Sequence, residues 1–439
     1  MEKTKTSLLV IMTVFLLSII INIFGYVFVI IENFLQKPDI SQKPEVITVD
    51  YDYIVPGEKT MAEPKGKVTV SKDEKQNVFT KITDMANSSK NYLEGKTKNI
   101  LLHNQFIEIN GATQRLMGKK IVIDADSETN ALKLNNGMLI NSGLGLAQNN
   151  NGSENKNDYK NELDKLKKLL QEKNIPLYVF MAANKLVVFD SQLPKGFHVT
   201  MSDSTDSYAA YLKEENIDYL DFRDAFNNKN FDYTSMFFKT DHHWTPETGV
   251  LVAGIIQKTL SEKLGFSFNS SYFELDNYTK KIYKSWFLGS TGKRVGVSYA
   301  GIDDFSVLTP KFDTSFQTET TNVYNKTIVK KGTFNEALCY PENLENDKYN
   351  LNPYVYYSGG DWPIQIIKNK NAKNDKKIIM FRDSYASVVT PFLANEYSEI
   401  ITLDTRNCTI NLRRMLDQIR PDVLIILSSA SIKSGFGAE

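Results

Sequence analysis

Two short segments of this 439-residue sequence contain residue types that could together perform acyl transfer. The first reads Asp241-His242-His243-Trp244, and the second reads Arg382-Asp383-Ser384-Tyr385. A serine hydroxyl becomes a strong nucleophile when a histidine takes its proton, and a carboxylate must hold that histidine in the correct tautomer. The two segments supply all three groups, so they predict a Ser-His-Asp site.

The first segment lies just before a predicted helix. Thr245 followed by Pro246 is a strong signal for a helix start, with a hydroxyl at the N-cap and proline at the first helical position. In the extended loop before it, Asp241 and His243 point to the same side, whereas adjacent residues point to opposite sides. We therefore expect Asp241 to orient His243, which acts as the base in place of His242.

The second segment follows an apolar run at 377–381 and precedes a predicted helix at 387–397. A serine at such a strand-to-helix turn is exposed at the carboxyl edge of a sheet, and the helix N-terminus offers N–H groups to a developing oxyanion. A serine in this position is more often an N-cap, and two histidines before a helix can be packing residues. The combination of both motifs is more specific than either alone.

The surrounding pattern predicts an α/β fold. Leucines at helical spacing from residue 158 on are followed by a strand at 175–181, a helix at 204–215 and a strand at 217–222. The rhythm returns with strands at 377–381, 400–403 and 423–427 and helices at 387–397 and 411–420. It predicts a parallel sheet covered by helices on both faces. Residues 266–372 lack helical periodicity and are predicted to be an insertion of strands and long loops.

The N-terminus predicts a membrane location. Residues 8–31 are almost entirely apolar and without charge, long enough to cross a bilayer and longer than the apolar part of a signal peptide. Lys3 and Lys5 precede this run and favour a cytoplasmic N-terminus. We expect a transmembrane signal-anchor at 1–33, an extracytoplasmic stalk at 34–95 and the catalytic domain at 96–439. The protein would be a single-pass protein of the cell membrane.

Composition narrows the alternatives. Lys plus Arg and Asp plus Glu both number 52, so the chain lacks the basic excess that nucleic-acid binding requires. Cys339 and Cys408 are too few for a zinc cluster and are expected to be unpaired. A manganese phosphoesterase also begins with Asp-His-His but needs further ligands, for which only His103 and His198 remain. Palmitoyl transfer is excluded because Trp244 stands where that signature has cysteine. We expect no cofactor and no metal.

The sequence resembles the SGNH-hydrolase superfamily, in its alginate O-acetyltransferase-like group and the branch named after Asp-His-His-Trp. Besides the two motifs, the matching segments are 286–296, 299–305, 310–312 and 357–361. The resemblance implies a three-layer, circularly permuted SGNH-like sheet, because here the Asp/His block precedes the serine block. It implies Ser384 as nucleophile, His243 as base and then acid, and Asp241 as its orienter.

The superfamily's oxyanion-hole asparagine has no clear equivalent in this sequence. The backbone N–H groups of Gly359 and Gly360 are candidates for the second oxyanion donor. His242, Arg382, Asp383 and Tyr385 are candidate accessory residues because they belong to the two motifs.

The resemblance further implies O-acetylation of a polysaccharide outside the cytoplasm, with a multi-pass membrane O-acyltransferase as the acyl donor. Two alternatives stay open at this point. One is an O-acetylesterase of the same glycans, and the other is a catalytically silent module that binds glycan.

Overall fold

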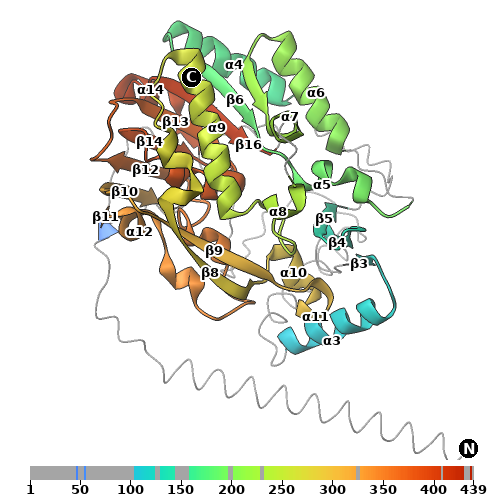
Figure 1. The fold of residues 1–439 in the computed structure, drawn as a ribbon. Helices are drawn as coiled ribbons and strands as arrows, with labels where there is room; N and C mark the ends of the chain where they lie inside the picture. Colours follow the sequence, from blue (N-terminus) through green and yellow to red (C-terminus); the bar gives the residue numbers. More distant parts are fainter. Residues whose placement is uncertain are drawn as a thin grey trace, which may run out of the picture. The chain divides into compact units, whose positions relative to one another are not determined.

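A mixed β-sheet is the main element of the computed structural model, which describes residues 46–47, 54–55, 103–123, 129–143, 158–195, 201–227, 232–322, 327–406, 409–429 and 436–437 (Figure 1). Within these residues the sheet has nine strands. In spatial order they are β1 (Val46–Ile47), β11 (Thr327–Gly332), β10 (Phe316–Thr321), β12 (Ile364–Asn369), β14 (Glu399–Leu403), β13 (Lys377–Arg382), β16 (Val423–Ser428), β6 (Leu177–Met181) and β7 (Asp218–Asp221).

Several predicted features lie outside the described residues. They are the membrane anchor at 8–31, most of the stalk at 34–95, the loop at 150–157, His198 and Cys408. No helix within the described residues is both long enough and apolar enough to cross a membrane. The chain divides into two compact units, one of residues 1–43 and 61–110 and one of residues 44–60 and 111–439. The first is described only by the beginning of α3 (His103–Leu116), and both chemical motifs belong to the second.

The strands predicted to form a parallel sheet do so, but the sheet is mixed because further strands extend it. The strands β14, β13, β16, β6 and β7 are parallel to their neighbours. Strands β12, β10, β11 and β1 continue the sheet in antiparallel pairing. Strands β10 and β11 follow each other through a short connection, which can only join antiparallel neighbours. Residues 266–372 are therefore partly built into the main sheet, and do not form only a separate insertion.

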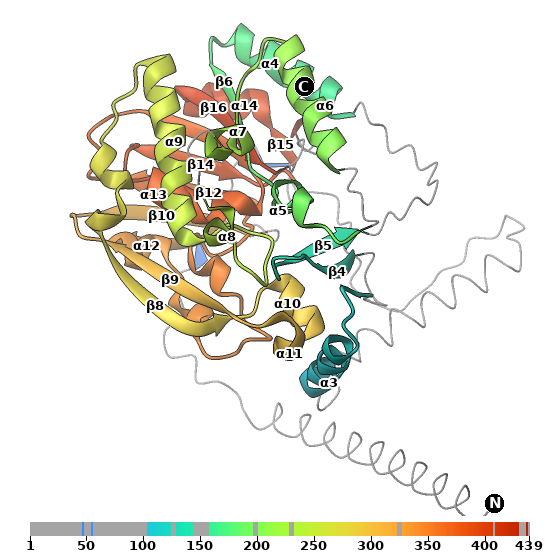
Figure 2. The ribbon, with the colours of Figure 1, turned by 45° about the vertical axis from the view of Figure 1, so that its right-hand side comes forward.

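Side chains alternate between the two faces of the sheet and create two apolar cores. On β13, Ile379 and Phe381 pack with α4 (Asp158–Glu172), α6 (Met201–Glu214) and α14 (Leu412–Ile419). The intervening Ile378 and Met380 pack in the other core with α9 (Pro246–Leu264) and α13 (Thr390–Leu393). Helices on both faces give three layers, as the views in Figures 1 and 2 show. The predicted helices before and after β6 are thereby confirmed.

Two predicted helices differ in outcome. Helix α9 begins as expected, with Thr245 as the N-cap and Pro246 in the first turn, and ends at Gly265 in the left-handed region. The helix expected at 387–397 is instead a 3-10 turn, η6 (Ser384–Val388), followed by the short α13. Pro391 cannot donate to a preceding turn, so a continuous helix through this segment is broken.

The region 266–372 also contains short helices where only strands and loops were expected. They are α10 (Ser290–Val295), α11 (Val297–Ala300) and α12 (Phe334–Leu338). Helices of this length are too short to show a periodicity of 3.6 residues. A long antiparallel ribbon of β8 (Tyr278–Phe287) and β9 (Asp303–Pro310) runs beside them.

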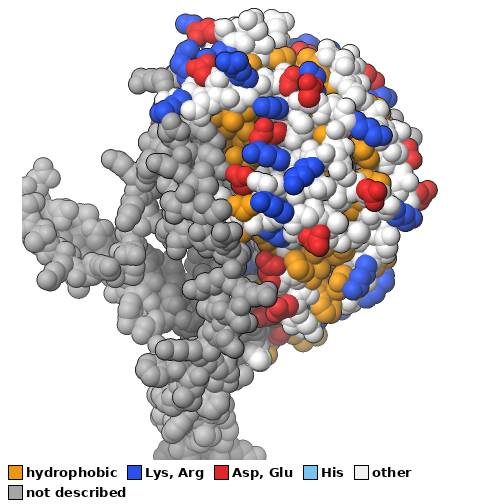
Figure 3. All heavy atoms as spheres, turned by 90° about the vertical axis from the view of Figure 1, so that its left-hand side faces the viewer, with side chains coloured by type: hydrophobic (Ala, Val, Ile, Leu, Met, Phe, Trp, Pro, Cys, Tyr) orange, Lys and Arg blue, Asp and Glu red, His pale blue; other side chains and the backbone are white. Residues whose placement is uncertain are grey.

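Two further sheets lie in the second unit. One contains β3 (Ile121–Val122), β4 (Thr129–Lys133) and β5 (Leu139–Gly143), and the other contains β17 (Phe436–Gly437), β15 (Thr409–Asn411) and β2 (Ile54–Val55). On the face drawn in Figure 3, Lys and Arg side chains are interspersed with Asp and Glu side chains. That mixture agrees with the zero net charge of the sequence.

Candidate active site

The Asp-His-His-Trp loop connects α8 (Tyr233–Met236) with α9 and is held in place by hydrogen bonds of buried groups. Trp244 is fully buried, and its indole N–H donates to the carbonyl of Tyr385 at 2.8 Å. The Phe238 amide donates to the carbonyl of His243 at 3.1 Å, which closes the loop on itself. The loop is therefore fastened to the turn that carries Ser384.

The side chains of Asp241, His243 and Ser384 form one hydrogen-bonded row. His243 Nδ1 lies 2.6 Å from Asp241 Oδ1, and His243 Nε2 lies 2.7 Å from Ser384 Oγ. Because an ionised carboxylate can only accept, Nδ1 carries the proton and Nε2 accepts from the serine hydroxyl. This is the tautomer that a general base needs in order to deprotonate a serine.

Asp241 is buried and its charge is well compensated. Burial alone would raise the pKa of Asp241, but His243, His242 and the hydrogen bonds of His243 and the Ser290 amide hold that pKa well below its usual value. The Ser290 amide donates to Oδ2 at 2.7 Å, and the His243 amide donates to Oδ1 at 3.0 Å. The carboxylate is thus kept ionised and fixed in place.

The Ser384 turn is held by its neighbour Asp383. One oxygen of Asp383 accepts the Tyr385 amide at 2.9 Å, and the other accepts the amide and hydroxyl of Ser429 at 2.7 and 2.9 Å. Asp383 therefore ties the turn to the end of β16. The amide of Ser384 itself donates to no acceptor in the described structure, so it is available to a developing oxyanion.

The helix N-terminus predicted after Ser384 is smaller than expected. The turn η6 has only five residues, and its Tyr385 amide is already occupied by Asp383. Its dipole is correspondingly weak, because the effect sums over aligned peptide units. Of the Ser384 and Tyr385 amides, only that of Ser384 is available as an oxyanion donor.

Gly359 and Gly360, the candidates for the second oxyanion donor, lie beside the Ser384 turn and make different contacts. The Gly359 amide donates to the carbonyl of Val355 at 3.1 Å, so it is not available as the second oxyanion donor in this structure. The Gly360 carbonyl accepts from the guanidinium of Arg382 at 2.9 Å. Gly359 has a φ of +76°, and a Cβ there would meet the Tyr340 ring, so the position needs glycine.

Arg382 is buried, and its guanidinium belongs to a charged cluster. Its guanidinium donates to Asp361 at 3.1 Å, and Asp361 also pairs with Arg406 at 3.3 Å. Arg406 in turn binds both oxygens of Asp404. This network joins the carboxyl ends of β13 and β14 next to the Ser384 turn, with Asp361 and Arg406 partly exposed.

His242 lies beside the row without joining it. Its Nδ1 is 3.6 Å from Asp241 Oδ1 and 3.4 Å from Ser290 Oγ, and its ring contacts that of His243 at a tilt of 38°. Burial, and secondarily the charge of His243, lower the pKa of His242 to about 4. His242 is therefore neutral near pH 7. Its backbone carbonyl accepts the Tyr385 hydroxyl at 2.9 Å.

Two residues that sequence reasoning missed complete the site. Tyr354 is buried, its hydroxyl donates to the Ser384 carbonyl at 2.8 Å, and its ring stacks on His243. Nothing in the local sequence around Tyr354 distinguishes it from the many other tyrosines.

Lys185, in α5 (Lys185–Val188), is also missed by the sequence reasoning. Its ammonium is buried within hydrogen-bond distance of four carbonyls, which share its three N–H groups. They are those of Leu139, Phe238, Lys239 and Asp241, at 2.8, 2.5, 3.1 and 2.7 Å. Burial lowers the pKa of Lys185 to about 7, against the opposing charges of Asp303 and Asp241. A lysine directly after a buried strand and before an apolar run was a signal that could have identified it.

A metal would have to use the same residues. Within the described part of the chain, Asp241, His242 and His243 offer ligand atoms that all lie within 4.8 Å of one another. Coordination there would compete with the Asp241–His243 hydrogen bond and with the contact to Ser384. Asp241, His243 and Ser384 are already hydrogen-bonded to one another in an arrangement suited to proton transfer.

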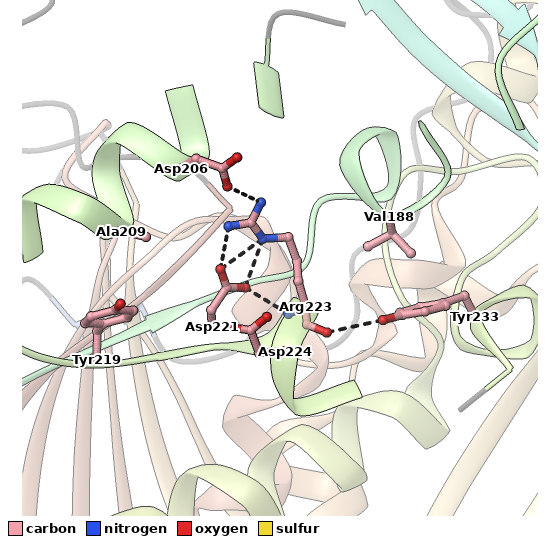
Figure 4. Close-up of a pocket in the computed structure, with 8 residues that line it drawn as sticks. All are labelled: Val188, Asp206, Ala209, Tyr219, Asp221, Arg223, Asp224 and Tyr233. Carbon is pink, nitrogen blue, oxygen red and sulfur yellow. Dashed lines mark hydrogen bonds and ion pairs between the residues drawn. The ribbon is translucent and has the colours of Figure 1, made fainter. Parts of the chain in front are cut away.

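A separate pocket of about 470 Å³ lies next to β7 and α7 (Phe222–Asn227), away from this row (Figure 4). Arg223 at its centre donates to both oxygens of Asp221 and to Asp206. The Tyr233 hydroxyl donates to the carbonyl of Arg223 at 3.2 Å. None of Asp241, His243 and Ser384 lines this pocket.

Residues 143–284 match the family model described as the SGNH hydrolase-like domain of acetyltransferase AlgX. The resemblance to the alginate O-acetyltransferase-like group is confirmed. The matched range contains Asp241 and His243 and ends before Ser384. No curated protein matches this chain.

Solved structures resemble this chain in fold. Bacillus cereus PatB1 aligns with a TM-score of 0.53 and 18% identity, over 70% of this chain and 95% of PatB1. PatB1 with a sulfonyl adduct gives 0.51 and 19%, over 63% and 90%. A DHHW family protein from Eubacterium siraeum gives 0.52 and 18%, over 72% and 95%. At these identities the likeness concerns the fold.

Proposed function

We propose that this protein is a serine O-acyltransferase that moves acetyl groups onto hydroxyls of a cell-surface or secreted polysaccharide. The observation that carries the proposal is the row in which Ser384 Oγ, His243 Nε2 and Asp241 are joined by bonds of 2.7 and 2.6 Å. The match of residues 143–284 to an acetyltransferase family model supports acetyl as the group transferred.

In the first half-reaction, Ser384 Oγ attacks the carbonyl carbon of an acetyl donor while its proton moves to His243 Nε2. The tetrahedral intermediate collapses when the bond to the donor breaks, and His243 returns the proton to the leaving group. Acetyl-Ser384 remains. The Ser384 amide supports the transient negative charge on the oxygen.

In the second half-reaction, a sugar hydroxyl takes the place of the leaving group. His243 accepts the hydroxyl proton, the sugar oxygen attacks the acetyl carbonyl, and the Ser384 oxygen leaves with the proton from His243. The product is an O-acetyl sugar and free enzyme. Asp241 stays ionised throughout and stabilises the imidazolium.

We propose that the apolar segment at 8–31 anchors the chain in the cell membrane, with the N-terminus cytoplasmic and the catalytic domain outside. A multi-pass membrane O-acyltransferase is the proposed donor, because acetyl would have to be delivered across the membrane. The anchor keeps the second unit near that source.

The test is transfer itself. Protein is supplied with an isotopically labelled aryl acetate and with oligosaccharides cut from candidate surface polysaccharides, and the products are separated. We expect labelled O-acetyl sugar from the wild-type protein and none from Ser384→Ala. Labelled acetate alone with every oligosaccharide would make the protein an esterase. Neither product, together with glycan binding by the folded protein, would make it a glycan-binding module.

A further inference from the structure

The ring of His243 is enclosed between two other rings. The Tyr354 ring lies parallel to it, with centroids 4.0 Å apart and an angle of 11° between planes. The His242 ring lies 3.7 Å away at 38°. Two rings this close cannot share one face of an imidazole, so Tyr354 and His242 cover opposite faces.

Tyr354 is fixed in this place from both ends. It belongs to η5 (Pro353–Tyr356), where the Asn352 side chain accepts its amide at 3.2 Å. Its ring is only 1% exposed, and its hydroxyl donates to the Ser384 carbonyl at 2.8 Å. One residue therefore contacts both the base and the backbone of the nucleophile.

The phenol of Tyr354 is neutral in this setting. Burial raises the pKa of Tyr354 well above its usual value, and the charge of Asp241 adds to this. A neutral aromatic ring has a negative face and a positive edge, so it attracts a cation placed over its face. That attraction acts on an imidazolium and is absent for the neutral imidazole.

His243 gains a positive charge in each half-reaction when it takes the serine or acceptor proton. An interaction present in that state and absent in the resting state lowers the barrier without tightening the ground state. The flanking His242 adds a second neutral ring, because its own pKa lies near 4 and it carries no charge at neutral pH.

We propose that Tyr354 is a positioning residue whose ring face stabilises the imidazolium of His243 during acylation and deacylation of Ser384. The proposal rests on the function proposed above. It differs from the family's triad assignment because Tyr354 lies outside both sequence motifs and acts through His243.

Other titratable groups near the ring define what a pH experiment must control. Asp241 and His242 face it from its own loop, Ser384 and Tyr385 from η6, and Tyr354 from η5. Charges at longer range come from Lys185, Lys293, Asp361 and Asp383. The variants below change only Tyr354 and, in the NMR experiment, Ser384; all the other groups are retained.

Tyr354→Leu and Tyr354→Phe separate the ring from the hydroxyl. Leucine keeps the contact apolar but removes the aromatic face, whereas phenylalanine keeps the face and loses the bond to Ser384. We expect Tyr354→Leu to lower kcat/KM for an aryl acetate by roughly tenfold and to move the acidic limb of the pH profile down by about one pH unit. Tyr354→Phe should leave that limb in place. If the acidic limb of the pH profile does not move in Tyr354→Leu, Tyr354 contributes only packing.

A second measurement does not depend on catalysis. The His243 ring is titrated by NMR in Ser384→Ala protein, with and without Tyr354→Leu. We expect the titration midpoint to fall by about one pH unit when the aromatic face is removed, because the cation loses that stabilisation. Equal midpoints would overturn the proposal even if Ser384 is the nucleophile. If the midpoint shifts but the wild-type protein is never acylated at Ser384, the role of Tyr354 on the His243 ring is supported and the proposed function is rejected.

Discussion

Two adjacent histidines, His242 and His243, have different surroundings at the residue scale. His243 is almost fully buried and bonds to both Asp241 and Ser384. About a third of the His242 side chain is exposed, and its Nδ1 lies 3.4 Å from Ser290 Oγ and 3.6 Å from Asp241 Oδ1. This division follows from a local turn, in which both the amide and the Nδ1 of His243 bond to Asp241 Oδ1.

The first prediction compares the two histidines. His243→Ala should lower kcat/KM for an aryl acetate by about 10³-fold or more, close to the loss in Ser384→Ala, because members of such a row act as a unit. His242→Ala should lose less than about tenfold, since it removes only a stacked neutral ring. Steady-state kinetics of the three variants decide this. A larger loss in His242→Ala than in His243→Ala would reverse the assignment of the base.

The second prediction concerns acid stability. The pKa of His242 falls from its usual 6.5 to about 4 in the folded protein. Between these values the unfolded chain binds a proton that the folded chain does not, so stability falls as the pH decreases. In His242→Gln this contribution is absent, and urea unfolding between pH 7 and pH 4 should depend less on pH. An unchanged dependence would contradict the depressed pKa.

The sequence predicted part of this site for a physical reason. Asp241 and His243 are near neighbours in the chain, so local geometry alone relates them. Ser290, Tyr354 and Lys185 approach the row from distant segments, and no local pattern records such contacts. The sequence also did not show that the Gly359 amide is unavailable as an oxyanion donor, because that depends on a turn in which the amide donates to the Val355 carbonyl.

The loop before α9 depends, at the element scale, on a buried cation. Its carbonyls at Phe238, Lys239 and Asp241 point inward and have the Lys185 ammonium as a shared donor. Buried carbonyls without a donor are costly, so this contact decides whether the loop keeps its shape.

The third prediction follows from that contact. Lys185→Met preserves volume but leaves the carbonyls unpaired, and we expect it to reduce the free energy of unfolding by about 3–5 kcal/mol. The matched control is Lys133→Met. Among the described residues the half-buried ammonium of Lys133 donates to a single carbonyl, that of Tyr299, so the expected loss is about 1 kcal/mol. Urea unfolding of both variants is the measurement. Similar losses would show that Lys185 does not hold the loop.

Elements were predicted well where one residue pattern dominates. The buried strands β13, β14 and β16 are continuous apolar runs, and α9 has a strong capping signal. The prediction of a helix at 387–397 was wrong because it gave more weight to the apolar spacing than to Pro391, which breaks the helix. Strands β10, β11 and β12 lie in the region 266–372, for which only strands and long loops in general were expected. Their pairing with the main sheet depends on contacts that periodicity does not encode.

The site lies, at the scale of the whole molecule, at the carboxyl edge of the parallel half of the sheet. Ser384 follows β13, and the Asp361–Arg406 network joins the ends of β13 and β14 beside it. The segment at 44–60 belongs to the same unit, because β1 pairs with β11 and β2 pairs with β15. The unit that contains the two motifs therefore includes residues 44–60, which the sequence places in the predicted stalk.

The fourth prediction concerns the anchor. A chain of residues 34–439 keeps β1 and β2 but lacks the apolar segment, so it should be recovered in the soluble fraction and retain aryl-acetate hydrolysis. The full-length protein should sediment with membranes and require detergent for release. Cell fractionation with immunoblotting is the measurement. Full-length protein released into the medium with an intact N-terminus would contradict the anchor.

The most direct test of the central claim is the covalent intermediate on Ser384. Protein is exposed briefly to an activated acetyl ester, quenched in acid and digested with trypsin, which releases residues 383–406 as one peptide containing Ser384, Ser387 and Ser398. We predict one added acetyl group on this peptide, fragmented to Ser384, absent in Ser384→Ala and retained in the control Ser387→Ala. An acetyl group that persists in folded Ser384→Ala, or no acetyl group in the wild-type protein with any donor, would contradict the account.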